Sequence, residues 1–547
     1  MSAKQAVKYF PLLVVLSGLL ACTPREVDEL ETSDNSLTVL AGGESLQGVA
    51  LDAENGLSVF RGIPFAAPPT GDRRWKPPAA HTPRPGTQRA DEFGSACPQL
   101  QGNHDWYRQV ATLLGNPPET IGPLEDIDED CLYLNVWTNN LRGAEKLPVM
   151  VWIYGGANRN GYSHEPNYHG TGLAPRGVVF VSLNYRVGVM GYMAHPGLAA
   201  ESANNVAGNY GILDQIAALN WVQANIAAFG GDPDNVTVFG ESAGAANSAT
   251  LTASPLAAGL FRRAISQSGG YQLSQTRTQS DAEAIGTKIA DHLGFDPSMD
   301  DADVISGMRQ LDWMTVVSES ANAKAGGYTS VVVDGYVLPD AAGRIFLNAE
   351  QNDVDLMIGS NAHEYFMYQS EDLSREQVEE SIGRMGKPWA GEILELVADD
   401  LGADHRLASD RVSGGSRFLC PSKFIADSVD QRGGNAYFYH FTRVRPNGEK
   451  VLAYHGAEIP YALDTADSWL PADDVDAQLS NAMAQYWVNF ARTGSPNGEG
   501  LPAWPLYTAD GGNYMELGDE IREGDGLESA LCAIVKRQLT DRLEEGL

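Results

Sequence analysis

The chain has 547 residues, enough for several small domains or one large α/β domain, and its 43% apolar and 20% charged residues are typical of globular proteins. The formal net charge is −33, and such an excess of negative charge repels the phosphate backbone of DNA and RNA. Composition therefore excludes global disorder and argues against a nucleic-acid-binding function.

The first 21 residues are predicted to be an export signal. Lys4 and Lys8 precede the apolar stretch PLLVVLSGLLA, which is too short to span a bilayer comfortably and runs directly into Cys22. One interpretation is plain cleavage after a small residue. The ending LLAC also resembles the lipobox of bacterial lipoproteins, in which the cysteine becomes the lipid-modified first residue. Cys22 is then the anchor of an exported protein that contacts the membrane only through its lipid, residues 22–36 are a polar tether, and residues 37–547 are one domain.

Four further cysteines follow, at positions 97, 131, 420 and 532. An even number of cysteines in an exported chain permits two disulfides. Three pairings are compatible with this count, and the spacing alone does not choose among them.

Apolar, β-branched runs alternate with helical stretches along the chain. This alternation predicts an α/β fold with a large, mostly parallel sheet covered by helices on both faces. The expected strands lie in the runs LPVMVWIYG, GVVFVSLNY, NVTVFG, RRAISQSG, VDLMIGSN and NAYFYHF. Ligands of such sheets bind beyond the carboxyl ends of the strands.

Three of these runs end in chemically unusual loops. The first ends in YGGAN (154–158), the third in GESAG (240–244) and the fifth in SNAHE (360–364). If the strands are parallel, these loops share one edge of the sheet. The paired glycines of YGGAN could bind a phosphate, but no lysine followed by serine or threonine comes after them, and no dinucleotide pattern follows.

The stretch NVTVFGESAGAANSATLTA predicts a strand, a tight turn and an alanine-rich helix, with Ser242 between Gly240 and Gly244 at the turn. This is the setting of a nucleophile elbow, in which small flanking residues allow close backbone approach and the serine hydroxyl is presented at a helix N-terminus. The pentapeptide G-x-S-x-G by itself is a weak signal, and its strand and helix context strengthens it.

Residues 208–245, GNYGILDQIAALNWVQANIAAFGGDPDNVTVFGESAGA, resemble the signature segment of the type-B carboxylesterase and cholinesterase family of α/β hydrolases. Further matches are RGIPFAAPPTGDRRW, DEDCLYLNVW, NYRVGVMGY and WVNFARTGSPNG, and together they span about residues 37–535. The resemblance implies a serine esterase of the α/β-hydrolase fold that requires neither a metal nor an organic cofactor.

The resemblance also implies a catalytic triad of Ser242, Glu364 and His455. His455 stands in YHGAEIPYAL, similar to the segment around the family's catalytic base, and Glu364 stands in the family pattern G-x-N-x-x-E. A triad acid fixes the tautomer of the histidine whose other nitrogen faces the serine. The neighbouring His363 is a rival for the base, and we expect it to be a pocket or surface side chain instead.

The remaining site residues are carried over from the same family. Acyl transfer needs amide N–H groups aimed at the developing oxyanion, and the resemblance assigns them to Gly156, Ala157 and Ala243. Since this family often has glycine at position 157, we expect alanine to be tolerated there only with a negative φ. Supporting roles are expected for Gly155, Glu241 and Ser268, although Glu241 could be purely structural and Ser268 a satisfied buried hydroxyl.

Family similarity further implies the disulfide pairs Cys97–Cys131 and Cys420–Cys532, the first closing a loop over the entrance to the site. Residues 98–127 are expected to line that entrance. The stretch ETIGPLED lacks the tryptophan with which cholinesterases bind quaternary ammonium, so a choline specialist is not expected. Trp106 and Tyr107 could form an aromatic wall or be ordinary packing residues.

The sequence therefore predicts a carboxylesterase that acts on small-molecule esters with short-to-medium acyl chains. We also expect its site to have room for bulky or tertiary alcohols. A specialised lipase, or a hydrolase for one natural or xenobiotic ester, is the alternative within the enzymes. A non-catalytic binding protein on the same fold is the alternative outside them, and the joint presence of serine, acid, base and glycine-rich loop argues against it.

Overall fold

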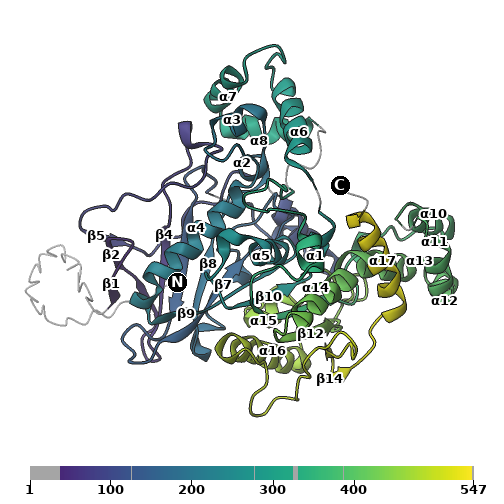
Figure 1. Cartoon of the computed structure of the whole chain (residues 1–547). Coiled ribbons are helices and arrows are strands. Elements are labelled where there is room, and N and C mark those ends of the chain that lie inside the picture. The colour runs from purple at the N-terminus through teal and green to yellow at the C-terminus, as the bar shows by residue number, and fades with distance from the viewer. Residues whose placement is uncertain are drawn as a thin grey trace, which may run out of the picture. The chain divides into compact units, whose positions relative to one another are not determined.

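The computed structural model describes residues 37–544, apart from residues 101, 125, 276, 324–329 and 386. Leu37–Leu547 form one compact unit, which Figure 1 shows as a central sheet surrounded by helices. The predicted export signal, the anchor Cys22 and the tether lie outside the described residues.

An 11-stranded sheet occupies the centre of the described part of the chain. Listed from one edge to the other, its strands are β14 (Ile521–Gly524), β13 (Tyr514–Leu517), β12 (Ala436–Phe441), β11 (Asp355–Asn361), β10 (Arg263–Gln267), β9 (Gly231–Glu241), β7 (Leu147–Ile153), β8 (Val179–Leu183), β6 (Tyr133–Thr138), β4 (Leu57–Pro64) and β3 (Val49–Asp52). A separate small sheet has the order β1 (Thr38–Ala41), β2 (Glu44–Gln47) and β5 (Thr87–Arg89).

All six predicted strand runs are strands of the large sheet, and they pair in parallel from β8 to β12. Their carboxyl ends therefore meet at one edge, as the sequence predicts. Antiparallel strands are confined to the margins, where β14 pairs with β13 and where β3, β4 and β6 extend the other side.

Seventeen α-helices connect and cover these strands within the described residues. They are α1 (Gly102–Leu113), α2 (Gly188–Tyr192), α3 (Pro196–Glu201), α4 (Tyr210–Asn225), α5 (Ala243–Ala253), α6 (Gln279–His292), α7 (Asp301–Gln310), α8 (Trp313–Asn322), α9 (Ala342–Leu347), α10 (Arg375–Met385), α11 (Ala390–Leu396), α12 (Ala398–Ala403), α13 (His405–Gly414), α14 (Cys420–Gln431), α15 (Ile459–Leu463), α16 (Asp474–Thr493) and α17 (Ser529–Glu544). None of the helices described is long and apolar enough to cross a membrane.

Helices cover both faces of the sheet, as two adjacent residues of β10 demonstrate. Ser266 faces a small apolar space walled by α5 and α14. Gln267 points to the opposite face because successive strand residues alternate, and its side-chain oxygen accepts a hydrogen bond of 3.0 Å from Trp487 on α16. The nucleophile-bearing strand β9 is therefore held in the middle of a three-layer structure.

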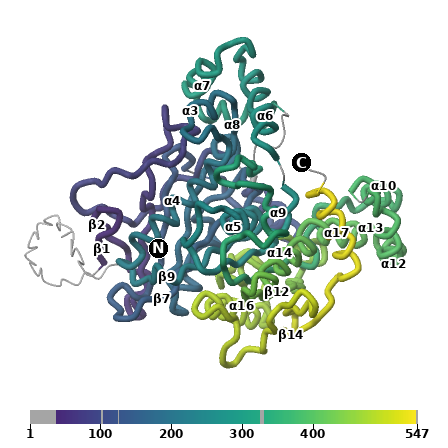
Figure 2. The backbone as a smooth tube through the Cα atoms, viewed as in Figure 1, coloured from purple at the N-terminus to yellow at the C-terminus, as the bar shows by residue number. Residues whose placement is uncertain are grey.

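Two helical groups extend beyond the sheet, and each has an apolar core of its own. One group contains α6, α7 and α8, whose buried residues include Ile289, Met308 and Val316. The other contains α10 to α13 and α17, with Val378, Val412 and Leu531 among its buried residues. Figure 2 shows the first group at the top and the second at the right.

Candidate active site

The predicted nucleophile lies at a sharp turn between β9 and α5. Ser242 has φ 53° and ψ −120°, a strained conformation for a residue with a side chain. The turn is possible because its neighbours are glycines: a Cβ atom on Gly240 or Gly244 would collide with the carbonyl oxygen of Ile153 on β7. Backbone packing therefore requires the glycines of G-x-S-x-G. Within this turn, the residue with the strained backbone is Ser242.

A hydrogen-bonded series joins Ser242 to two groups from other strands. Nε2 of His455 lies 2.8 Å from the Ser242 hydroxyl oxygen, and Nδ1 lies 2.6 Å from Oε2 of Glu364. Glu364 follows β11 and is 2% exposed. The structure thus brings the three residues of the predicted triad into the order serine, histidine, glutamate.

Glu364 is itself fixed by donors on its second oxygen. The Ser268 hydroxyl donates to Oε1 at 2.6 Å, and the backbone N–H of Asn361 donates at 2.8 Å. Ser268 has a left-handed backbone with φ 58°. These two donors leave Oε2 directed at the imidazole, so Ser268 is more than a satisfied buried hydroxyl.

The loop that carries His455 is tied to the acid strand by a buried amide. The Asn361 side chain donates to the carbonyl oxygen of Tyr454 at 2.7 Å and to Oε2 of Glu458 at 2.5 Å. Glu458 is fully buried, and its Oε1 accepts from the Gln267 side chain at 3.1 Å. Sequence reasoning did not assign Glu458, although it stands in the same segment, YHGAEIPY, that identified His455.

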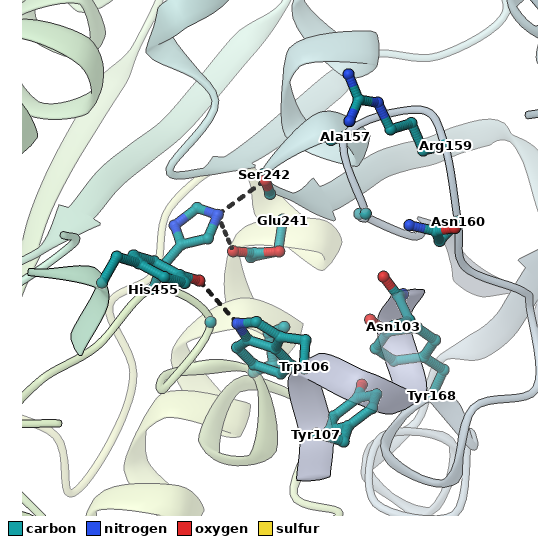
Figure 3. Close-up of a pocket in the computed structure, with 15 residues that line it drawn as sticks. Asn103, Trp106, Tyr107, Ala157, Arg159, Asn160, Tyr168, Glu241, Ser242 and His455 are labelled. Atoms are coloured by element: carbon teal, nitrogen blue, oxygen red, sulfur yellow. Dashed lines mark hydrogen bonds and ion pairs between the residues drawn. The ribbon is translucent and has the colours of Figure 1, made fainter. Parts of the chain in front are cut away.

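Glu241 lies beside the base as well as beside the nucleophile. Its Oε1 is 3.2 Å from Nε2 of His455, and Figure 3 shows the imidazole facing both Ser242 and Glu241. Burial, reinforced by the charges of Glu458 and Glu364, raises the pKa of Glu241 to about 8. Glu241 therefore acts on the histidine electrostatically.

The imidazole of His455 is also perturbed. Burial by itself lowers the pKa of His455, but the carboxylates of Glu241 and Glu364 oppose that effect and raise it to about 9. Because Glu241 and His455 are in contact, they titrate as one coupled pair. Protonation of Glu241 removes the larger of the two supporting charges, so the pKa of His455 falls when Glu241 is neutral.

The loop after β7 presents free amides next to Ser242. Among the described residues, neither the N–H of Gly156 nor that of Ala157 donates a hydrogen bond to the protein. The N–H of Ala243 begins α5 and has no acceptor within its own helix. Gly156, Ala157 and Ser242 line one cavity together. The arrangement provides donors suited to an oxyanion, which is the role that the family resemblance implies for them.

Ala157 corrects the expectation that its φ is negative. The residue has φ 57° and its neighbour Asn158 has φ 55°, both left-handed. A methyl group in this region costs about 1–2 kcal/mol. The loop holds the conformation through hydrogen bonds on either side, because Gly188 donates to the Asn158 carbonyl at 2.6 Å and Arg159 donates to the Gly156 carbonyl at 2.9 Å. Gly155 has no room for a side chain, since a Cβ there would lie 2.8 Å from Glu241.

Two cavities adjoin the nucleophile. The first has a volume of about 320 Å³ and is walled by Trp106, Tyr107 and Tyr168. Trp106 donates its indole N–H to the Tyr368 hydroxyl at 2.7 Å, and Tyr107 donates its hydroxyl to the buried carboxylate of Glu165 at 2.6 Å. The sequence left open whether Trp106 and Tyr107 form an aromatic wall or are ordinary packing residues, and the structure places both in the wall of this cavity. Figure 3 shows them on one helix, α1.

The second cavity has a volume of about 400 Å³ and shares Ala157, Ser242, Tyr368 and His455 with the first. The residues that line it alone come from segments far apart in sequence: Asn158, Tyr271, Gln275, Ser330, Glu364, Tyr365, Arg417 and Phe418. The ring of Phe418 packs on the imidazole of His455 with centroids 4.9 Å apart. Of the residues that line the second cavity, the sequence analysis had assigned a role to Ala157, Ser242, Glu364 and His455 and to none of the others.

His363 lies apart from this chemistry. Its Nδ1 accepts a long hydrogen bond of 3.4 Å from the Ala453 N–H, and it lines neither cavity. Burial lowers the pKa of His363 to about 4. It is a packing side chain, consistent with the choice of His455 as the base.

Both predicted disulfides are present. Cys97 is bonded to Cys131 and Cys420 to Cys532. The first bridge closes the segment that carries α1, and hence Trp106 and Tyr107, over the first cavity. Among the described residues, no group of three or more His, Cys, Asp or Glu side chains could hold a metal ion.

Comparison with known proteins agrees with this geometry. The model of the carboxylesterase family matches residues 36–535. The chain is 33% identical to fumonisin B1 esterase of Sphingopyxis macrogoltabida, over 91% of this chain and 89% of that protein, and 32% identical to human cocaine esterase, over 90% and 89%. The crystal structure of the carboxylesterase EST55 of Geobacillus stearothermophilus superposes with a TM-score of 0.78 at 31% identity, covering 91% of this chain and 99% of that one.

Proposed function

The chain belongs to the carboxylesterase family and is a carboxylic ester hydrolase, and we propose that it works through an acyl-enzyme formed on Ser242. One observation carries this proposal: the Ser242 hydroxyl, the His455 imidazole and the Glu364 carboxylate form an unbroken hydrogen-bonded series beside amides that have no acceptor. That combination supplies a nucleophile, a base and hydrogen-bond donors for the oxyanion within one site.

In the first step Ser242 attacks the ester carbonyl while Nε2 of His455 takes the hydroxyl proton. Glu364 holds Nδ1 protonated and stabilises the imidazolium that forms. The distances of 2.8 Å and 2.6 Å in this series are those of hydrogen bonds ready for proton transfer. His455 then returns the proton to the departing alcohol.

The tetrahedral oxyanion is stabilised by the amides of Gly156, Ala157 and Ala243. Removal of one such donor costs roughly 2.7–4 kcal/mol of transition-state stabilisation in other serine hydrolases. Since the Gly156 and Ala157 amides have no acceptor within the described protein, their hydrogen-bonding capacity is reserved for the substrate. Water subsequently attacks the acyl-enzyme, with His455 as base, and releases the acid.

Substitution of the nucleophile tests this function. Purified Ser242→Ala is expected to lose ester turnover by about three orders of magnitude or more, while its circular dichroism and melting temperature stay close to those of the parent. Ester turnover that survives the substitution would show that another residue is the nucleophile.

The range of esters is proposed to include short-to-medium acyl chains and bulky alcohols. Two cavities of about 320 and 400 Å³ meet at Ser242, so both parts of an ester have space. The relatives named for fumonisin B1 and cocaine suggest that a hydrolase specialised for one natural or xenobiotic ester is a serious second candidate. Relative kcat/KM for a series of acyl lengths and alcohol sizes separates a general esterase from a lipase, which prefers long chains, and from such a specialist.

We also propose that the mature protein is exported and lipid-anchored through Cys22. Two disulfides within the domain support an oxidising compartment, and the LLAC motif supports the anchor. Labelled palmitate is expected to be incorporated into the wild-type protein and not into Cys22→Ser. Equal labelling of both proteins would exclude Cys22 as the site.

A further inference from the structure

A second cavity beside the nucleophile contains Arg417. A tetrahedral carbon on Ser242 directs its acyl chain and its leaving alcohol along separate paths, and two cavities meet at Ser242 to receive them. Both have aromatic rings and one arginine in their walls, and the arginine of the first is Arg159. The second, here called the Arg417 cavity, has a cation at its wall together with polar groups of Tyr271, Gln275 and Tyr365.

Arg417 is an exposed side chain that lies close to residues flanking the base. Arg417 lies in the π-helical turn Gly415–Leu419, directly before Phe418, whose ring packs on His455. Such single π-helical turns within longer helices frequently occur at functional sites. Its guanidinium carbon is 5.5 Å from the centroid of the Tyr365 ring, which follows Glu364 in sequence. The cation therefore lies over the ring of a residue that adjoins the predicted triad.

Arg417 has no carboxylate partner. Among the described residues no acidic oxygen lies within 4.0 Å of its guanidinium, whereas the nearby Arg411 contacts both Asp400 and Glu528. Arg417 is exposed, so its charge is available to a ligand that enters the cavity. Glu364 lines the same cavity, but its two oxygens already accept hydrogen bonds from Ser268, Asn361 and His455.

Another polar group in the Arg417 cavity lacks a partner. The side-chain oxygen of Gln275 is buried without a hydrogen bond among the described residues. An amide can present either its oxygen or its nitrogen to a ligand. Arg417 therefore offers donors at this cavity, and the Gln275 oxygen offers an acceptor to a donor elsewhere on the ligand.

We propose that the ester cleaved at Ser242 carries a carboxylate on the part that enters the Arg417 cavity, and that the guanidinium of Arg417 binds this carboxylate. The inference rests on the proposed role of Ser242. A guanidinium fork matches the planar geometry of a carboxylate and forms charge-assisted hydrogen bonds with it. The remainder of the ester occupies the first cavity, against Trp106 and Tyr107.

The first cavity also contains an unpaired arginine, Arg159, but is a poorer match to an anion. Its acid Glu241 has an oxygen whose one polar contact within the described residues is His455, and this carboxyl would compete with a bound carboxylate. Arg159 also borders a separate hollow lined by Pro98, Val189 and Val317. Figure 3 shows Arg159 at the side of the cavity opposite Trp106. Arg159 therefore serves as the comparison for the test.

Matched esters that differ in one charge provide the test. With the carboxylate on the acyl part, monoethyl adipate is compared with ethyl hexanoate; with the carboxylate on the alcohol part, ω-acetoxyhexanoate is compared with hexyl acetate. Hydrolysis is followed by pH-stat titration at constant pH and ionic strength. We expect the wild-type enzyme to favour the charged member in one of the two pairs by about tenfold or more in kcat/KM.

Variants of Arg417 connect that preference to the residue. Arg417→Gln is expected to lose the preference, lowering kcat/KM for the charged ester by about 10–100-fold and for the neutral ester by less than about threefold. Arg417→Lys keeps the charge and should retain part of the preference. Arg384→Gln removes one positive charge on the remote helix α10, where Arg384 pairs with Glu380, and should leave the preference unchanged.

Three results would overturn the proposal: preference for the neutral member in both pairs, an equal loss for charged and neutral esters in Arg417→Gln, or loss of the preference in Arg159→Gln but not in Arg417→Gln. Rates on the neutral esters report folding and basal activity in every variant. If Ser242→Ala abolishes all turnover while the charge preference is absent, the esterase mechanism stands and this inference alone is wrong.

Discussion

The Ser268 hydroxyl donates a 2.6 Å hydrogen bond to Glu364, on the carboxylate oxygen that does not face His455. Loss of this donor in Ser268→Ala leaves the Asn361 amide as the remaining described donor on that oxygen. A hydrogen bond to a charged group is worth about 1.5–3 kcal/mol, so we expect kcat to fall by about tenfold or more with little change in KM. Ser268 positions the acid, and the pH profile of kcat should shift as well, because the carboxylate beside His455 is less well stabilised.

A neighbouring serine supplies the matched control for that prediction. Ser266 is also buried, but its hydroxyl faces α5 and α14 on the far side of β10 and lacks a partner in the described structure. Ser266→Ala should leave both kcat and its pH profile close to wild type. Equal effects of the two substitutions would mean that Ser268 contributes packing only.

Substitution of Glu241 is expected to move the acid limb of activity. The base works only when neutral, and the carboxylate of Glu241 contributes to the raised pKa of His455 at about 9. Glu241→Gln removes that charge, so the pKa of His455 falls and the midpoint of the acid limb of kcat/KM moves to lower pH. A pH profile of the free enzyme measures this shift. An unchanged limb, or one displaced to higher pH, would contradict the electrostatic role.

The raised pKa of Glu241 also determines whether stability rises or falls with pH. Burial raises the pKa of Glu241 from 4.5 to about 8, and Glu241 titrates together with His455, so the folded pair holds a proton that the unfolded chain has released between those values. Stability from this group is therefore lost as pH rises from about 4.5 to about 8. Glu241→Gln should show a smaller decline of melting temperature across that window than the wild type does.

Replacement of Ala157 by glycine tests the left-handed backbone beside the oxyanion amides. Glycine adopts φ 57° without strain, and the change also removes a methyl group that lines both cavities. Relief of about 1 kcal/mol of strain is offset by the greater entropy of the unfolded chain, so stability should change by less than about 1 kcal/mol.

Bulky alcohols should report the space that this methyl group occupies. The wild type is expected to hydrolyse a tertiary-alcohol ester such as tert-butyl acetate slowly but measurably, and Ala157→Gly should raise the ratio of tert-butyl to n-butyl acetate turnover several-fold. Complete inactivity of both proteins on tertiary esters, with primary esters cleaved well, would contradict this prediction.

The two disulfides should differ in their effect on activity. They span 34 and 112 residues, for which loop-closure entropy predicts stabilisation of about 3–5 kcal/mol each. The double variant Cys97→Ser/Cys131→Ser frees the segment that carries Trp106 and Tyr107, so KM should rise at temperatures where the protein is folded. The second disulfide joins α14 to α17, and neither of its cysteines lines either cavity. Cys420→Ser/Cys532→Ser should therefore lower the melting temperature with less change in KM. Thermal unfolding and ester kinetics on both pairs check this contrast.

Sequence reasoning succeeded where local backbone geometry dictates residue type. The elbow requires Gly240 and Gly244 because any side chain there meets Ile153, and the parallel strands follow from their apolar runs. The pairing of the disulfides and the choice of Glu364 and His455 came from family resemblance, since spacing alone leaves them open.

The cavity walls could not be predicted in the same way. Tyr271, Tyr365, Arg417 and Phe418 come from three separate segments to line one cavity, and no short pattern in the sequence marks any of them. Their convergence is a property of tertiary packing. The positive φ of Ala157 was also missed, because hydrogen bonds from residues outside the YGGAN motif hold a conformation that alanine by itself disfavours.

Trapping of the acyl-enzyme tests the central claim most directly. Enzyme mixed with an excess of 4-nitrophenyl acetate and quenched in acid within the first turnovers should carry one acetyl group by intact-protein mass spectrometry. Peptide mapping should place that group on Ser242, and Ser242→Ala should carry none. An acetyl group on another residue at the rate of turnover, or full ester turnover by Ser242→Ala, would contradict the account.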